Sequence, residues 1–271
     1  MSKKSETHLA EWGHNVSETR FITEPNVYML ARPQIDEWHL KEFYQDEGLG
    51  KPDEITDEFA DKLIEIAGRV CYMSFANPRP GGNEAYIRHI LEVGHGSVLE
   101  HANFSLIFTG VSRSLTHELI RHRAGYGYSQ LSQRYVDESD CAFVVPPEMI
   151  DDPLDLDDWK AAMIRAKNQY IDFANRLYAK LSHITDKTAR RKKAREAARS
   201  VLPNATETKI VVTGNARAWR HFLELRGSKH ADAEIRRLAL VVLGVLQREA
   251  PNIFGDYVVT DGCISTPNRK V

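Results

Sequence analysis

The sequence predicts an α+β fold in which an antiparallel or mixed sheet is flanked by long helices. Short apolar or β-branched runs at 27–32, 104–108, 141–145 and 208–213 are typical of strands. Longer segments with apolar residues three or four positions apart are typical of helices. These strands and helices do not alternate regularly, as the βαβ units of a parallel sheet would. We therefore expect α+β architecture.

Helix boundaries are predicted from capping residues and helix breakers. Thr56 is the N-cap candidate of an amphipathic helix over 56–70, and the acids that follow it favour the helix macrodipole. Ser112 or Ser114 is the cap of a helix predicted to run through Arg123. Further helices are predicted at 84–93, 153 to about 184, 188–200, 215–226 and 231–249, and a loop at 77–82.

The chain is long enough for one large domain with a full core. The polar segment 1–20 is predicted to be a flexible lead-in, and 21–271 a single catalytic domain. No secretory signal and no apolar run of membrane-spanning length is present, so we expect a cytoplasmic protein with no membrane association. Three widely spaced cysteines argue against disulfides and a thiolate zinc site.

The formal net charge of −2 argues against nucleic acid as a partner, whereas the arginines gather at 121–134, 188–199 and 217–237. Such local clusters on a near-neutral protein suit small anionic ligands such as phosphates. The basic run 190–195 leaves a nucleic-acid-binding module as an alternative. Glu196 and the acidic stretch 151–158 dilute its field, so a solvated helix face is the simpler interpretation.

The first candidate site is Arg121-His122-Arg123, followed by the segment SQLSQRY. The triplet alone fits solvated charges at a helix C-terminus. If the following segment is extended, Gln130, Ser132 and Arg134 point to one side. Their amide, hydroxyl and guanidinium suit a phosphate with a neighbouring base or sugar.

A second candidate lies in the segment HGSVLEH at 95–101, whose histidines raise the alternative of a metal-dependent hydrolase. His117 and His122 do not complete a zinc-protease motif, because they stand five residues apart where HExxH requires four. On a continuous helix, Glu118 instead faces Arg121 and His122. We therefore predict no metal site.

The third candidate joins Arg199, Asn215, Arg217, His221 and Arg226. Arg217 and His221 share a helix face, but Arg226 is nine positions beyond Arg217, about 180° around the helix. Either the helix ends early near position 227, or the two arginines serve ligands on opposite faces. A site assembled between subunits would accommodate this separation.

Together these motifs resemble one family. RHRAGYGYSQLSQRY is similar to the RHR…S…SxR signature of the flavin-dependent thymidylate synthases. HGSVLEH, ARSVLP, NARAWRHFLELR and KHADAEIRRLA extend the resemblance over about 95–240, in the expected order. One departure is an additional residue within 124–128, so no role is assigned there.

The resemblance implies the fold of the flavin-dependent thymidylate synthases. It also implies that the protein is a flavoprotein methyltransferase of dTMP biosynthesis, which converts dUMP to dTMP. Its cofactor would be FAD, and its other partners methylenetetrahydrofolate and NADPH. The family implies a homotetramer with shared active sites and no serine or cysteine nucleophile. Flavin contacts would be His95, Ser97, Arg121, His122, Arg123, Gln130, Asn215, Arg217 and His221. The dUMP contacts would be Glu118, Arg121, Gln130, Ser132, Arg134 and Arg199. Arg226 would contact dUMP as the catalytic residue that favours ionisation at uracil N3.

Overall fold

The computed structural model describes residues 19–49, 56 and 58–271. Most of the predicted lead-in, residues 1–18, lies outside the described residues. The described chain divides into two compact units. We call the unit of residues 19–24, 110–116 and 130–208 the hairpin unit, and the unit of residues 25–109, 117–129 and 209–271 the sheet unit. The predicted single domain over 21–271 stays a prediction.

A four-stranded sheet has the order β2-β3-β6-β4, with β2 (Asn26–Ala31), β3 (Asn103–Ser112), β4 (Tyr126–Gln130) and β6 (Glu207–Asn215). β2 is antiparallel to β3, with Val27 opposite Phe108 and Met29 opposite Leu106. Alternate β3 residues, including Phe104, are fully buried, as period-two patterning requires. The predicted α+β class and the strands at 27–32, 104–108 and 208–213 are confirmed.

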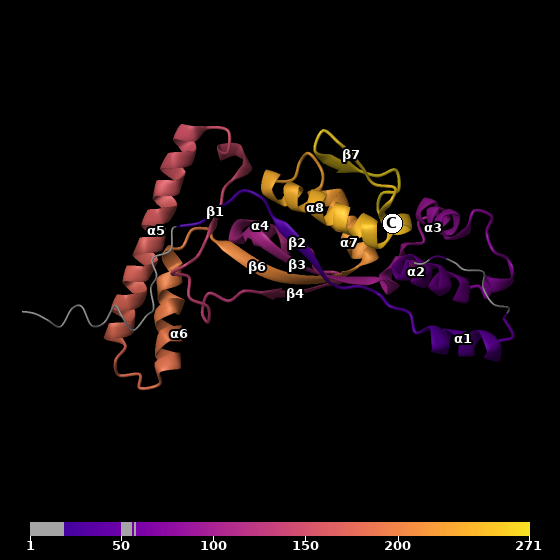
Figure 1. Ribbon diagram of the computed structural model, residues 1–271, viewed down its shortest axis with the longest axis horizontal. Coiled ribbons are helices and arrows are strands. Elements are labelled where there is room, and N and C mark those ends of the chain that lie inside the picture. Colours follow the sequence, from indigo (N-terminus) through magenta and orange to yellow (C-terminus); the bar gives the residue numbers. More distant parts are fainter. Residues whose placement is uncertain (1–18, 50–55, 57) are drawn as a thin grey trace, which may run out of the picture. The chain divides into compact units, whose positions relative to one another are not determined.

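The described residues of the sheet unit also contain six helices. They are α1 (Glu37–Asp46), α2 (Phe59–Val70), α3 (Gly82–Glu92), α7 (Ala216–Arg226), α8 (Ala233–Glu249) and the short α9 (Pro251–Phe254). Figure 1 shows α7 and α8 lying along the strands, and Trp219 of α7 meets Phe108 of β3 edge-on at 6.2 Å between ring centroids. Short helical turns lie at Ser74–Ala76 and Gly96–His101, and β7 (Val258–Thr260) and β8 (Cys263–Ser265) form a hairpin.

Helix α7 is fixed by a buried ion pair. The Arg220 side chain is fully buried and donates to both carboxylate oxygens of Asp256, at 2.6 and 2.8 Å. Burial alone would lower the pKa of Arg220, but its bonds to Asp256 reverse this and raise the pKa. This clamp sets the rotation of α7 and thereby the direction of the side chains on its other faces.

The N-terminal cap of α2 differs from the prediction. The N-cap position is Glu58 rather than Thr56, and the Thr56 hydroxyl accepts the backbone N–H of Glu58 at 3.3 Å. Thr56 therefore shapes the entry to the helix from two residues upstream.

Helix α4 (Arg113–Leu119) is shorter than predicted. Ser112 caps it, because its hydroxyl accepts the N–H of Leu115 at 3.0 Å. The predicted continuation through Arg123 is wrong. After Leu119 the chain tightens into a turn, and the hydroxyl of Tyr128 donates to the Leu119 and His122 carbonyls. The predicted helical face of Glu118, Arg121 and His122 therefore does not form.

The hairpin unit is built on α5 (Pro153–Lys180) and α6 (Lys187–Ala198), which lie side by side in Figure 1. Asp152 and Asp186 cap these helices by accepting two backbone N–H groups each. Tyr170 and Ala198 are buried between the helices. The strand predicted at 141–145 is limited to β5 (Phe143–Val144), which pairs in parallel with β1 (Phe21–Ile22). Short helical turns lie at Pro147–Met149 and Arg199–Val201.

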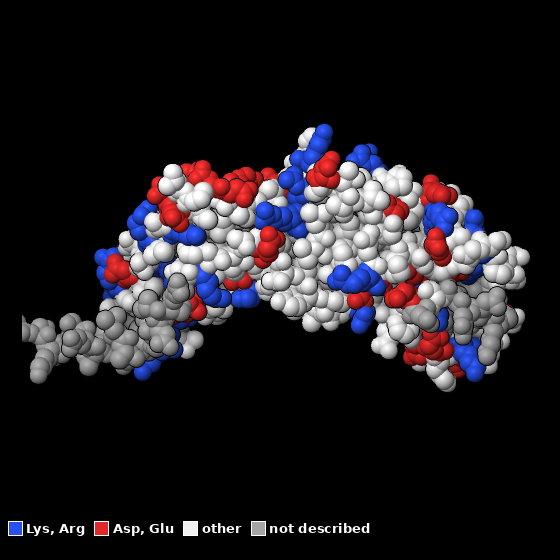
Figure 2. Space-filling model, turned by 45° about the horizontal axis from the view of Figure 1, so that its top comes forward, with Lys and Arg blue, Asp and Glu red and all other residues white. Residues whose placement is uncertain are grey.

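The surface carries both signs of charge. Figure 2 shows acidic and basic side chains interspersed over the face displayed, without one large field of a single sign. Among the described helices, none combines the length and apolar character needed to cross a bilayer.

Candidate functional site

Arg226, the last residue of α7, is held by Glu118 of α4 and by His122 of the turn that follows α4. Its Nε donates to Nε2 of His122 at 2.9 Å. One Nη bonds to the Glu118 carboxylate, and the other donates to the Glu118 carbonyl at 3.1 Å. These bonds use three of the five guanidinium N–H groups, so two N–H groups remain to donate.

The imidazole of His122 is neutral in this arrangement. Burial, together with the charges of Arg226 and His221, lowers its pKa to about 4. A neutral imidazole nitrogen can accept a hydrogen bond, whereas an imidazolium cannot. The site thus combines a permanent cation with an uncharged acceptor that orients it.

This group faces a cavity of about 520 Å³, which we call the Arg226 pocket. Its lining combines guanidinium, imidazole and aromatic groups. The lining residues are Arg121, His122, Arg123, Ala124, Tyr126, His221, Leu225 and Arg226. The Arg121-His122-Arg123 triplet and Arg226, which the sequence separates by about a hundred positions, therefore meet in one pocket of the sheet unit.

A second cavity of about 570 Å³, the Arg217 pocket, lies beside another face of α7. Its lining residues are Glu100, Ala124, Gly125, Asn215, Arg217, Ala218, His221, Glu224, Lys270 and Val271. Arg217 and Arg226 thus line different pockets, in agreement with their predicted 180° separation. The two pockets share Ala124 and His221.

Gly125 brings the chain close to the start of α7. Its φ is +76°, and an added Cβ would lie 3.1 Å from both the Ala218 Cβ and the Asn215 amide nitrogen. Asn215 is the N-cap of α7 and accepts the N–H of Ala218 at 2.9 Å. Ala124, Gly125 and Tyr126 were given no role from sequence, yet they line these pockets. In the sequence, only the glycine at position 125 indicated that the backbone comes close to another group here.

His95 and Ser97 are exposed and line neither pocket. The residue between them, Gly96, is buried, and a Cβ there would come 3.0 Å from the Arg217 guanidinium. Arg217 itself pairs with Glu100 at 2.7 Å. The segment around His95 therefore lies against Arg217 without contributing a pocket wall.

The remaining predicted residues belong to the hairpin unit. The Gln130 amide donates to the hydroxyls of Thr116 and Thr208 at 3.1 and 3.3 Å. The condition under which Gln130, Ser132 and Arg134 would point to one side, an extended segment, is not met, because β4 ends at Gln130. A turn follows, in which the Ser132 carbonyl accepts the N–H groups of the third and fourth residues after it, at 3.1 and 3.0 Å.

Two arginines of this unit lie in surroundings that favour an anion. Arg134 pairs with Glu196 at 3.2 Å, while its Nε is buried with no acceptor from the described residues. Burial lowers the pKa of Arg113, the Glu138 carboxylate counteracts this shift, and the charge of Arg199 adds to it. A bound anion near Arg199 would relieve this repulsion.

The pockets hold no candidate thiolate or metal centre. Burial raises the pKa of Cys141 to about 12, and neither Cys71 nor Cys263 lines either pocket. Within the described parts of the chain, no cluster of three or more His, Cys, Asp or Glu residues could hold a metal ion.

Residues 54–252 match the protein family described as thymidylate synthase complementing protein. The flavin-dependent thymidylate synthase of Mycolicibacterium gilvum is 56% identical over 200 residues, which cover 73% of this chain and 80% of that protein. The enzyme of that name from Mycobacterium tuberculosis is 54% identical, with the same coverage. This chain belongs to the flavin-dependent thymidylate synthase family. Membership confirms the family recognised from the motifs, the methyltransferase class and the flavin cofactor.

A solved structure supports the fold of a flavin-dependent thymidylate synthase at lower identity. It is the UMP/dUMP methylase PolB from Streptomyces cacaoi bound with 5-Br UMP, with a TM-score of 0.62 and 21% identity. The match covers 88% of this chain and 95% of that one. At this identity the similarity extends to the fold alone.

Proposed function

We propose that the protein converts dUMP to dTMP, with methylenetetrahydrofolate as the one-carbon donor and NADPH as the reductant of FAD. The observation that carries this proposal is the Arg226 pocket, in which a fixed guanidinium faces a cavity large enough for a nucleobase. We further propose a cytoplasmic homotetramer with shared active sites.

The Arg217 pocket suits a flavin nucleotide. It combines the cations Arg217 and Lys270 with the Asn215 amide and the His221 imidazole, and glycine allows close backbone approach at position 125. We assign FAD binding to His95, Ser97, Arg121, His122, Arg123, Gln130, Asn215, Arg217 and His221. When bound, FAD supplies the hydride, and the protein supplies binding, orientation and charge.

Arg226 activates the uracil ring in this proposal. C5 becomes nucleophilic when negative charge develops over N3 and O4, and a positioned guanidinium stabilises that charge. His122 and Glu118 use three N–H groups of Arg226 and thereby fix the direction of the other two. No reorganisation of Arg226 is then needed as the charge develops.

Binding of dUMP is assigned to Glu118, Arg121, Gln130, Ser132, Arg134, Arg199 and Arg226. Arg134 and Arg199 supply charge for the phosphate, and Ser132 supplies a hydroxyl. The buried, unsatisfied Nε of Arg134 supports this assignment, since an acceptor there would complete its hydrogen bonding. We propose no serine or cysteine nucleophile: the Ser132 hydroxyl is assigned to the phosphate, and burial raises the pKa of the Cys141 thiol to about 12.

Substitution of Arg226 tests this function. In Arg226→Ala we expect dTMP formation to fall by about 10²–10³-fold, the usual cost of removing one charge-stabilising donor. Bound FAD, measured by its visible absorbance per protein chain, should stay at the wild-type level. Arg217→Ala is the matched control, because it removes the same charge from the other pocket and should lower FAD content. Turnover of Arg226→Ala within twofold of wild type would refute the assignment.

A further inference from the structure

The hydroxyl of Tyr128 binds both ends of the turn at residues 119–122, which follows α4. It donates to the Leu119 carbonyl at 3.1 Å and to the His122 carbonyl at 2.5 Å. We call these two hydrogen bonds the Tyr128 clip. The turn also closes on itself, because the His122 N–H donates to the Leu119 carbonyl at 3.1 Å. Since Tyr128 belongs to β4, the clip ties the whole turn to a strand of the sheet.

The clipped turn connects the two residues that hold Arg226. Glu118 directly precedes Leu119, and its carbonyl accepts an N–H of the Arg226 guanidinium at 3.1 Å. His122, at the other end of the turn, accepts the Arg226 Nε–H at 2.9 Å between nitrogens. A change in the shape of the turn would therefore move Glu118 and His122 relative to each other. Because both residues direct the guanidinium, Arg226 would then lose its fixed orientation.

The ring of Tyr128 is held firmly, so its hydroxyl is a fixed point for the turn. The ring stacks on Tyr126, with 5.8 Å between centroids and 21° between the ring planes. Tyr126 in turn meets the fully buried Trp219 of α7 edge-on at 5.2 Å. Burial raises the pKa of Tyr128 to about 12, so the phenol keeps its proton and remains a donor near neutral pH.

Tyr128 lines neither the Arg226 pocket nor the Arg217 pocket. Any effect of its hydroxyl on a bound nucleotide must therefore pass through the turn. The imidazole of His122 also meets the rings of His221 and Phe222 edge-on, at 5.7 and 5.6 Å between centroids. These contacts would keep the imidazole nearby without the clip, so loss of the clip should misdirect Arg226 rather than release it.

We propose that Tyr128 is a positioning residue for the methylation of dUMP, because its clip fixes the turn from which Glu118 and His122 direct Arg226 toward the uracil ring. This rests on the role of Arg226 in the proposed function. The reaction then depends on a phenol that touches neither the substrate nor the cofactor.

Tyr128→Phe tests the proposal, because it removes the hydroxyl and keeps the stacked ring. With FAD saturating, we expect kcat for dTMP formation to fall about tenfold, since a displaced catalytic group lowers the rate of the chemical step. KM for dUMP should stay within twofold of wild type. An unchanged kcat would overturn the proposal, and so would a loss that appears only in KM.

A double-mutant cycle distinguishes positioning of Arg226 from general support of the fold. In the Arg226→Ala background, Tyr128→Phe should lower turnover by less than a further twofold, because no guanidinium is left to direct. In the Arg217→Ala background, the tenfold loss should persist. Equal losses in both backgrounds would show that Tyr128 acts independently of Arg226, which would overturn the proposal.

Tyr257→Phe is the matched control. The buried Tyr257 hydroxyl donates to the Arg220 carbonyl at 3.0 Å, so this substitution also removes a phenol–carbonyl bond from the sheet unit, but one outside the turn. Both variants should unfold at a lower urea concentration than wild type, because each loses a buried hydrogen bond. Only Tyr128→Phe should lose turnover. Equal turnover in the two variants would contradict a specific role of the clip.

Hydrogen exchange separates this proposal from the proposed function, because it needs no turnover. In FAD-loaded protein without dUMP, the amides of residues 119–123 should exchange faster in Tyr128→Phe than in wild type, and at the wild-type rate in Tyr257→Phe. Unchanged exchange in Tyr128→Phe would show that another group fixes the turn, which would overturn the proposal. Failure of the wild type to form dTMP would refute the proposed function, and the exchange rates would still decide whether the clip holds the turn.

Discussion

The hydrogen bond between Arg226 and His122 couples the position of the Arg226 charge to the protonation state of His122. The guanidinium donates to imidazole Nε2, which requires a neutral His122. Burial and the Arg226 charge lower the pKa of His122 to about 4, so the neutral form dominates near pH 7. The positive charge of Arg226, which the proposed chemistry requires, thus helps to keep His122 neutral. Neutral His122 in turn accepts the hydrogen bond that orients Arg226.

His122 should make stability depend on pH between about 4 and 6.5. In the unfolded chain His122 has its ordinary pKa of about 6.5, whereas in the native protein its pKa is about 4. As pH falls through this window, the unfolded state binds a proton that the native state does not. The free energy of unfolding should therefore decrease, by about 3 kcal/mol at pH 4.

Urea unfolding of wild type and His122→Gln at pH 8, 6.5, 5 and 4 measures this effect. Glutamine retains an acceptor for Arg226 but does not titrate, so the variant should lose less stability toward low pH. The difference between the two proteins is the informative quantity. Burial also raises the pKa of Asp61 to about 7, which produces the opposite slope in both proteins and cancels. Parallel pH profiles would contradict the assignment.

At the scale of elements, α9 depends on a carboxylate supplied by α2. Asp61 is fully buried, and its two oxygens accept the N–H groups of Asn252 and Ile253 at 3.0 and 3.2 Å. The first N–H groups of a helix have no partner within the helix, so a buried helix start needs such an acceptor. Asp61 thereby ties two helices that lie nearly two hundred residues apart in sequence.

Removal of this acceptor should cost substantial stability. We expect Asp61→Ala to lower the free energy of unfolding by roughly 2–4 kcal/mol, because two buried N–H groups lose their partner. Asp61→Asn keeps one carbonyl oxygen and should lose less. Chemical denaturation at pH 6 measures both. Asp157→Ala, on the exposed first turns of α5, is the control and should change stability little. Equal stabilities of Asp61→Ala and wild type would show that another group caps α9.

Local patterns were sufficient to predict most elements. Ser112 and the apolar spacing of α7 and α8 act over one or two turns, so the sequence contains the whole cause. The early end of α4 depends instead on Tyr128, whose hydroxyl binds carbonyls six and nine residues back. The turn at Ser132 and helix α1 likewise lack a strong periodic signal. Long-range hydrogen bonds of this kind cannot be recognised from residue spacing.

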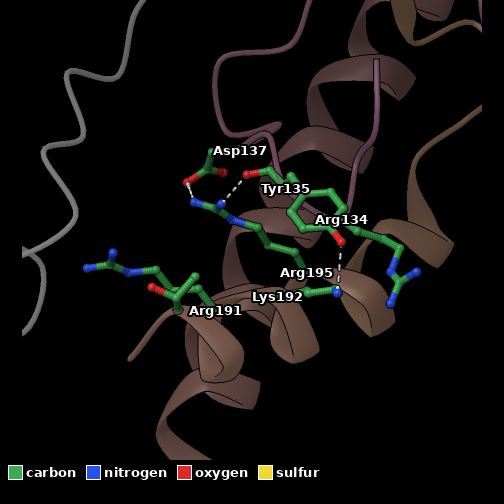
Figure 3. Close-up of a pocket in the computed structure, with 7 residues that line it drawn as sticks. Arg134, Tyr135, Asp137, Arg191, Lys192 and Arg195 are labelled. Carbon is green, nitrogen blue, oxygen red and sulfur yellow. Dashed lines mark hydrogen bonds and ion pairs between the residues drawn. The ribbon is translucent and has the colours of Figure 1, made fainter. Parts of the chain in front are cut away.

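In the candidate site, too, local features could be predicted from the sequence and long-range contacts could not. The 180° separation of Arg217 and Arg226 follows from helix geometry, and the two residues line separate pockets as it requires. Pairing of Glu118 with Arg226 joins residues 108 positions apart and had no local signal. Thr188, Arg191, Lys192 and Arg195 share one face of α6 through their helical spacing and line a cavity (Figure 3), whereas the basic run by itself indicated only a charged helix. Which cations share a pocket depends on their partners, since Arg195 bonds to Asp137 whereas Arg190 donates to the Tyr178 carbonyl.

At the scale of the whole molecule, the residues assigned to dUMP are distributed over both units. Glu118, Arg121 and Arg226 belong to the sheet unit, whereas Ser132 and Arg134 belong to the hairpin unit. A homotetramer allows one nucleotide to contact residues of different chains. We therefore predict that Arg134 and Arg226 reach the same dUMP from different subunits.

Complementation between inactive variants measures this arrangement. Arg134→Ala and Arg226→Ala should each have little activity alone. When the two chains are co-expressed with different tags and purified as mixed tetramers, about a quarter of the sites should carry neither substitution, if each site draws on two chains. The mixed enzyme should then recover about a quarter of wild-type dTMP formation. Glu118→Ala mixed with Arg226→Ala is the control, because these residues contact each other within one chain and every site would carry a defect. If the Arg134 and Arg226 mixture stays as inactive as its parents, both arginines act from the same subunit or from separate sites.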